Sequence, residues 1–110
     1  MTINITGNNV HLNDDLKSYA EEKVLKFIDV IVEPAVCEIY LSNEFGPKGG
    51  EDKLVRINLS LPEEKNPIHV EAQTDDFFGS IDLAQEKLGR EIMQYKEKIK
   101  IGPRHEDDEK

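Results

Sequence analysis

The residues best suited to chemistry in this chain are cations repeated along its last amphipathic segment, residues 75–100. An α-helix turns about 100° per residue, which places three of these cations in one sector with a leucine and a glutamine: Leu83, Lys87, Arg90, Gln94 and Lys98. Acids lie at the borders of this sector and not inside it. Lysine and arginine at helical spacing can bind phosphate groups, whereas the ordinary explanation of such a run is a solvated face of alternating charge. The stripe alone leaves both interpretations open.

The chain as a whole is acidic, which opposes binding to nucleic acid. It has 110 residues, 37% hydrophobic and 34% charged, with a formal net charge of -9. Residues 101–110 hold four acids and two bases, which leaves 19 acids, 12 bases and a net charge of -7 in residues 1–100. A hypothesis of RNA binding must therefore rest on the local arrangement of cations.

Length and composition are typical of one compact domain in the cytoplasm. No apolar run approaches the roughly 20 residues that a membrane span needs. The first ten residues have neither the basic start nor the apolar block of a secretory signal. Cys37 is the only cysteine, and its position in an apolar run predicts a buried strand residue.

Hydrophobic periodicity predicts the element order β-α-β-β-β-α. Asn13 is a good N-cap for the first helix, which we expect to end near Val32, before Pro34. Thr74 or Asp75 is expected to cap the second helix, which Gly102-Pro103 should stop. Alternating apolar residues predict strands at residues 3–5, 36–42, 54–61 and 68–72.

These elements predict an α+β two-layer sandwich. Three consecutive strands with short connections form an antiparallel meander, and a right-handed helical crossover sets the first strand parallel to the second. The result is a four-stranded sheet with both helices on one face. We expect residues 1–101 to form this single domain and residues 102–110 to form a disordered acidic tail.

The first helix adds cations to the predicted helical surface. Its flank carries Lys23 and Lys26 beside Tyr19 and Val30. If this flank faces the second helix, the cations of both helices form one bipartite basic patch: Lys23, Lys26, Lys87, Arg90 and Lys98. The alternative is that each cation forms an exposed pair with a local acid, such as Glu22 with Lys26 or Glu86 with Arg90.

The sequence indicates no catalytic, metal or cofactor site. The three histidines are scattered, and His69 alternates outward from a strand. The glycine-rich segment 46–50 follows no phosphate-loop spacing and opens no helix. Asp75-Asp76 is better explained by helix capping than by metal binding. We therefore expect neither an enzyme nor a small-molecule substrate.

Two long segments resemble the ribosome hibernation-promoting factor family, also called ribosome-associated inhibitors or ribosomal subunit interface proteins: TINITGNNVHLNDDLKSYAEEKVLKF and VEAQTDDFFGSIDLAQEKLGREIMQYKEK. The most specific part is the second helix, with Asp76-Phe77-Phe78, Lys87-Leu88-x-Arg90 and Tyr95-Lys96-x-Lys98. The likeness covers roughly residues 2–100, and the chain looks like a short member of the family.

The resemblance implies the same sandwich, which is similar to double-stranded RNA-binding domains. It also implies binding of the small ribosomal subunit and its ribosomal RNA in the decoding channel, where the protein blocks messenger and transfer RNA during starvation or stationary phase. By position the RNA contacts are Lys23, Lys26, Lys87 and Arg90, with Lys98 as a weaker addition, and a monomer is expected off the ribosome. Gln94 stands where members often have a basic residue, which lowers the expected number of phosphate contacts. The alternative is an acidic protein-interaction module without RNA contact.

Overall fold

A single four-stranded sheet organises the chain. The computed structural model describes residues 1–44, 53–62 and 64–101, with side chains described up to residue 97. The order along the chain is β1 (Thr2–Asn8), α1 (Asp14–Leu25), the short 3₁₀ helix η1 (Ile28–Val30), β2 (Val36–Asn43), β3 (Lys53–Ser60), β4 (Ile68–Thr74) and α2 (Phe77–Ile101). The predicted order β-α-β-β-β-α is confirmed.

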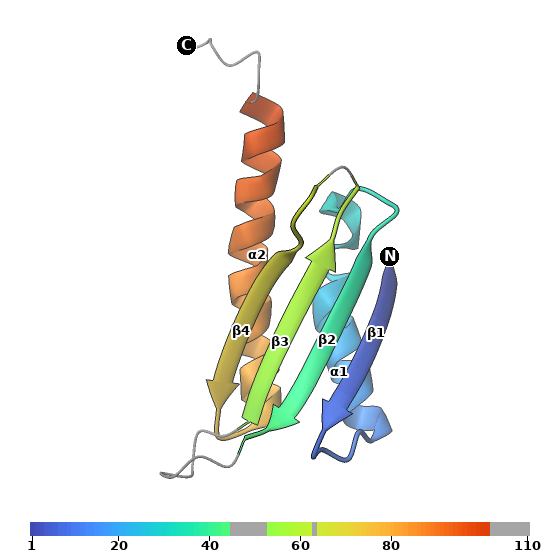
Figure 1. The fold of residues 1–110 in the computed structure, drawn as a ribbon, viewed down its shortest axis with the longest axis vertical. Helices are drawn as coiled ribbons and strands as arrows, with labels where there is room; N and C mark the ends of the chain where they lie inside the picture. The colour runs from blue at the N-terminus through green and yellow to red at the C-terminus, as the bar shows by residue number, and fades with distance from the viewer. Residues whose placement is uncertain (45–52, 63, 102–110) are drawn as a thin grey trace.

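The strands lie in the order β1-β2-β3-β4 (Figure 1). β1 runs parallel to β2, whereas β2 with β3 and β3 with β4 are antiparallel. Both helices lie behind the sheet in Figure 1, so the molecule has one helix layer and one sheet layer. This is the predicted α+β sandwich, because two amphipathic helices bury their apolar stripes on one face of the sheet.

The core lies between these two layers. Each element contributes the residues that its periodicity predicts: every second residue of a strand and every third or fourth residue of a helix. α1 buries Leu16, Ala20 and Val24, and α2 buries Ile81, Ala84, Leu88 and Ile92. The inner face of the sheet contributes Cys37, Ile39, Leu41, Val55, Ile57, Leu59, Val70 and Ala72.

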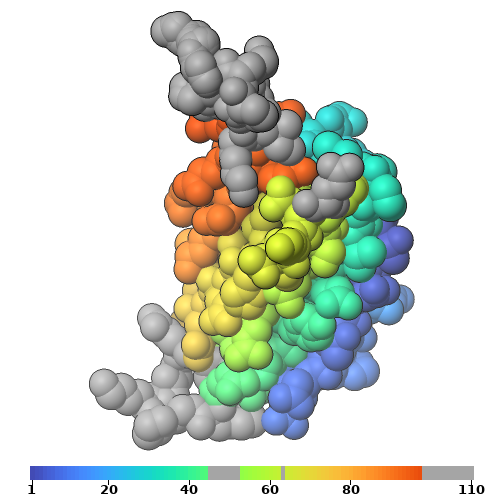
Figure 2. All heavy atoms as spheres, turned by 45° about the horizontal axis from the view of Figure 1, so that its top comes forward, coloured from blue at the N-terminus to red at the C-terminus, as the bar shows by residue number. Residues whose placement is uncertain are grey.

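The opposite face of the sheet is not covered by helices (Figure 2), and the residues that point outward from it are largely polar. There Glu71 accepts a hydrogen bond from His69 at 3.0 Å and pairs with Arg56 at 3.2 Å. The hydrogen bond from His69, with the charge of Arg56, lowers the pKa of the Glu71 carboxyl. This face is therefore a mixed surface in which acids and bases already neutralise each other.

The first helix is shorter than predicted. Asn13 caps it as expected, since its side chain accepts from the Leu16 backbone N–H at 2.8 Å. The expected end near Val32 is wrong, because α1 ends at Leu25 and only one 3₁₀ turn follows. Residues 28–32 contain four β-branched side chains, which lose rotamer freedom in a helix and weaken its continuation.

The start of α2 is also set differently. Asp76, rather than Thr74 or Asp75, caps the helix, because its carboxylate accepts from the Gly79 N–H at 2.9 Å. The Thr74 hydroxyl instead accepts from the Asp76 N–H at 3.1 Å and fixes the turn before the cap. The predicted loop at residues 46–50, the Gly102-Pro103 stop and the acidic tail lie outside the described residues.

Candidate nucleic-acid interface

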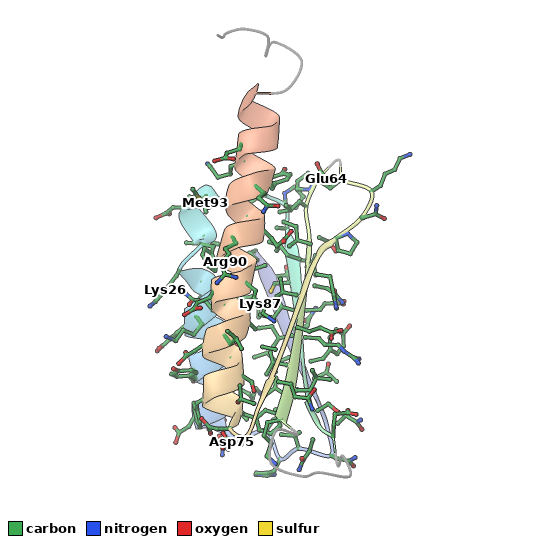
Figure 3. All side chains as sticks on the ribbon, turned by 90° about the vertical axis from the view of Figure 1, so that its left-hand side faces the viewer. Lys26, Glu64, Asp75, Lys87, Arg90 and Met93 are labelled. Carbon is green, nitrogen blue, oxygen red and sulfur yellow. The ribbon has the colours of Figure 1, made fainter. Side chains whose placement is uncertain are left out.

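The candidate interface is the surface formed by α1 and α2 on the side away from the sheet. Because the apolar stripe of each helix packs on the sheet, the polar flanks of the helix face either solvent or a neighbouring element. Figure 3 views the molecule from the β4 edge of the sheet with α2 in front; Lys26 of α1 lies on one side of α2 and Lys87 lies on the other, toward the sheet. In this view Arg90 lies between them, on the side of α2 that faces the viewer.

Arg90 is a predicted RNA contact with a largely exposed side chain. Its side chain is 68% exposed, and its guanidinium is 3.8 Å from the Glu86 carboxylate one helical turn away. Such an exposed i,i+4 pair contributes only a few tenths of a kcal/mol, so a phosphate can replace it at little cost. The local pair that the sequence suggested for Arg90 is therefore present but weak.

Lys87 lies on the flank of α2 that faces the edge of the sheet. Its ammonium donates to the Glu71 backbone carbonyl at 2.8 Å, beside a shallow open hollow lined also by Leu54, Ala72 and Gln73. The bond satisfies a carbonyl of edge strand β4, and an ammonium has two further N–H donors. Lys87 is thus anchored to the sheet and keeps donors for a ligand.

Lys26 and Lys23 project from α1 on the opposite side of α2. Lys26 is exposed, and among the described residues it forms no ion pair within 4 Å, including the suggested pair with Glu22. Lys23 is more enclosed: its side chain is 23% exposed, and its ammonium is 3.2 Å from the Asp82 carboxylate of α2. The two lysines of α1 therefore differ in how readily they can reach a ligand.

The structure changes the shape of the predicted basic patch. The flank of α2 that bears Lys87 faces β4 and not α1, so the cations of the two helices do not form the single bipartite patch that was expected. They lie instead across α2, with Arg90 in the middle. The side chain of Lys98, the fifth predicted contact, lies outside the described side chains.

Sequence reasoning missed Asp82 as a partner of α1. The Asp82 carboxylate accepts from the Tyr19 hydroxyl at 2.6 Å and pairs with Lys23, so both α1 residues meet it from across the helix interface. The hydrogen bond from Tyr19, followed by that from Lys23, lowers the pKa of Asp82. The available signal was helical phase, because Asp82 lies about 100° from the core residue Ile81.

Other chemistry finds little support in the described residues. They contain no group of three or more His, Cys, Asp or Glu side chains that could hold a metal ion. Cys37 is fully buried, and burial raises the pKa of its thiol to about 12. Of the helices described, none combines the length and the apolar composition of a membrane span.

Fold and surface together define a small α+β domain with a mixed polar sheet face and a helical face that presents cations. A family model described as Sigma 54 modulation protein / S30EA ribosomal protein matches residues 3–100. The chain belongs to this family, which is one of ribosome-associated factors and not of enzymes. The resemblance seen in the sequence is thereby confirmed.

Two curated relatives are named ribosome hibernation promotion factor. The protein of Lactococcus lactis subsp. cremoris (strain MG1363) is 28% identical over 102 residues, which are 93% of this chain and 53% of that protein. The protein of Bacillus subtilis (strain 168) is 26% identical over 99 residues, which are 90% of this chain and 50% of that protein. The chain spans about half the length of these relatives.

Two solved structures share the fold. A ribosomal subunit interface protein from Coxiella burnetii has a TM-score of 0.71 and 27% identity, and the match covers 87% of this chain and 98% of that one. The N-terminal domain of Thermus thermophilus Protein Y has the same TM-score at 21% identity, over 86% of this chain and 99% of that one. Both matches run through nearly the whole of the other chain.

Proposed function

We propose that this chain is a ribosome hibernation factor that docks its helical face on the RNA of the small ribosomal subunit. Membership of the family over residues 3–100 carries the proposal, together with relatives that are named ribosome hibernation promotion factors. The proposed site is the decoding channel, where the bound body excludes messenger and transfer RNA and stops translation in stress or stationary phase. Such a factor acts in the cytoplasm and needs no cofactor.

The charge distribution supports the helical face over the sheet face. Arg90, Lys87 and Lys26 are spread across α2 and α1. Arg90 forms only the exposed pair with Glu86 at 3.8 Å, and among the described contacts Lys87 and Lys26 form no ion pair. On the sheet face, by contrast, Arg56 and His69 both contact Glu71. Lysine and arginine bind phosphate oxygens and position a protein on RNA without reading its sequence, which suits a structured RNA surface.

A charge-reversed variant tests this proposal. Lys87→Glu with Arg90→Glu should abolish co-sedimentation with purified small subunits, because it replaces two phosphate contacts by two repulsions. A matched control reverses two exposed cations elsewhere, Lys17→Glu with Lys65→Glu, and gives the same net charge. Circular dichroism should show that both variants keep the fold.

The two outcomes separate specific docking from a general effect of charge. Loss of binding in the Lys87/Arg90 variant alone supports the helical face. Equal loss in both variants, or unchanged binding in both, contradicts it. Binding of wild-type protein that survives nuclease digestion of the ribosomal RNA would favour the alternative, an acidic module that binds a basic protein.

A further inference from the structure

One carboxylate oxygen joins the two helices of the proposed interface. The Tyr19 hydroxyl donates to Asp82 Oδ1 at 2.6 Å, and Lys23 Nζ lies 3.2 Å from the same oxygen. The Lys23 ammonium also lies 5.1 Å from the centre of the Tyr19 ring, and Phe78 packs edge-on against that ring at 4.9 Å. Asp82 of α2, whose side chain is 49% exposed, therefore meets a cation and a hydroxyl of α1 at the edge of the helix interface.

This contact distinguishes Lys23 from the other cations of the face. Its side chain is 23% exposed, whereas that of Arg90 is 68% exposed. Arg90 is 3.8 Å from its acid, whereas Lys23 is 3.2 Å from Asp82. The hydrogen bond with Asp82 raises the pKa of Lys23, and the bonds from Tyr19 and Lys23 lower that of Asp82, so both groups are charged at neutral pH.

We propose that Asp82 is a specificity-determining residue that excludes phosphate from the junction between α1 and α2 by acting as a built-in counter-ion for Lys23. The inference rests on the proposed function, since it concerns the same RNA-binding face. A phosphate that approaches Lys23 must displace a bonded carboxylate and meets its negative charge at close range. Lys23 is then a structural cation, and phosphate binding falls to Lys26, Lys87 and Arg90.

Exclusion of phosphate from this junction of the two helices has a measurable consequence. Each lysine or arginine that neutralises a phosphate steepens the dependence of binding on salt by about 0.7–0.9 in log K against log salt. A lysine held by Asp82 neutralises no phosphate and adds nothing to this slope. The acid thereby limits tight binding to RNA surfaces that match the outer cations.

The test uses purified small ribosomal subunits and the substitution Asp82→Asn. Asparagine keeps the size of the side chain and an acceptor for the Tyr19 hydroxyl, but it releases Lys23. The slope of log K against log salt should become steeper by about 0.7–0.9, the value for one phosphate contact. The affinity of Asp82→Asn relative to wild type should therefore be about threefold higher at roughly 50 mM salt than at roughly 200 mM salt. Glu38→Gln on the open sheet face is the matched control, because it changes the net charge equally at a distance from the helices.

A second substitution, at Lys23, tests whether the effect of Asp82→Asn comes from release of Lys23 or from an indirect change in the fold. Lys23→Gln alone should leave the wild-type slope unchanged, and the double variant Asp82→Asn with Lys23→Gln should return to that slope. The inference is overturned if Asp82→Asn behaves like Glu38→Gln, if Lys23→Gln alone flattens the slope by one contact, or if the gain persists in the double variant.

Failure of the proposed function looks different. If wild-type binding shows no salt dependence, or survives reversal of Lys87 and Arg90, then the basic face itself is refuted, and the role of Asp82 with it. If that reversal abolishes binding while Asp82→Asn changes nothing beyond its control, only the inference about Asp82 is refuted.

Discussion

Ser80→Ala should destabilise the domain although it removes a single oxygen atom. Ser80 is fully buried in the first turns of α2. Its hydroxyl donates to the Lys53 backbone carbonyl at 2.6 Å and accepts from the Thr74 backbone N–H at 3.0 Å. It therefore connects the start of α2 to the strands β3 and β4.

The expected magnitude follows from these two bonds. Loss of the partner of a buried donor or acceptor costs about 1–3 kcal/mol. Lys53 and Thr74 are partly buried, so the lower limit applies to each, and the two together give about 2 kcal/mol. Alanine favours a helix over serine by up to about 0.5 kcal/mol, which partly offsets this loss.

The matched control is Ser18→Ala, at an exposed position of α1. It gains the same helix propensity and loses no bond among the described contacts, so the difference between the variants isolates the buried hydroxyl. Urea unfolding followed by circular dichroism should give a free energy of unfolding about 2 kcal/mol lower for Ser80→Ala than for Ser18→Ala, with unchanged m-values. In thermal unfolding this corresponds to a midpoint lower by roughly 10 °C. A difference below about 0.5 kcal/mol would refute the reasoning.

Three further outcomes are expected. Leu88→Ala should lower the free energy of unfolding by about 2–5 kcal/mol, because Leu88 is fully buried, whereas Met93→Ala at a 60% exposed position should change it little in the same urea titration. Cys37 should resist a thiol reagent at pH 8 in the native protein and react after unfolding, since burial raises its pKa to about 12; rapid native labelling would contradict this. The pKa of Asp82 is lowered chiefly by the Tyr19 hydroxyl, so its contribution to stability is complete above the ordinary value of 3.8 and disappears as pH falls through the folded value. The free energy of unfolding of Asp82→Asn should therefore fall less below about pH 4 than that of wild type. The same fall in both proteins would contradict a stabilising role of the Asp82 carboxylate.

The exposed cations show how far sequence reasoning reaches on the candidate site. Helical phase placed Arg90 on the outside of α2, and the structure agrees. The angular position of a residue around the helix axis does not predict which neighbouring element lies against each flank of the helix. Lys87 proved to face β4, and Asp82 proved to face α1. In place of the expected bipartite patch, Lys26 and Lys87 lie on opposite sides of α2 with Arg90 between them, and Lys23 is paired with Asp82.

The ends of the helices show the same division between local and tertiary information. Asn13 could be identified as a cap from its type and position, because an N-cap bond joins residues three apart in the chain. The early end of α1 at Leu25 was not foreseen, although the β-branched residues that follow weaken a helix. The role of Ser80 leaves no local signal in the sequence, since its partner Lys53 lies 27 residues away.

The element order, the strand faces, the apolar stripes of both helices and the family could all be predicted from the residues alone. These depend on periodicity and on short-range bonds, which a single chain displays in its residue numbers. Three contacts emerge from the packing of the elements: Asp82 pairs with Lys23, Lys87 donates to the Glu71 carbonyl, and Ser80 joins α2 to the sheet. Such contacts depend on how packed elements are rotated and offset, and a shift of a few ångströms makes or breaks a hydrogen bond.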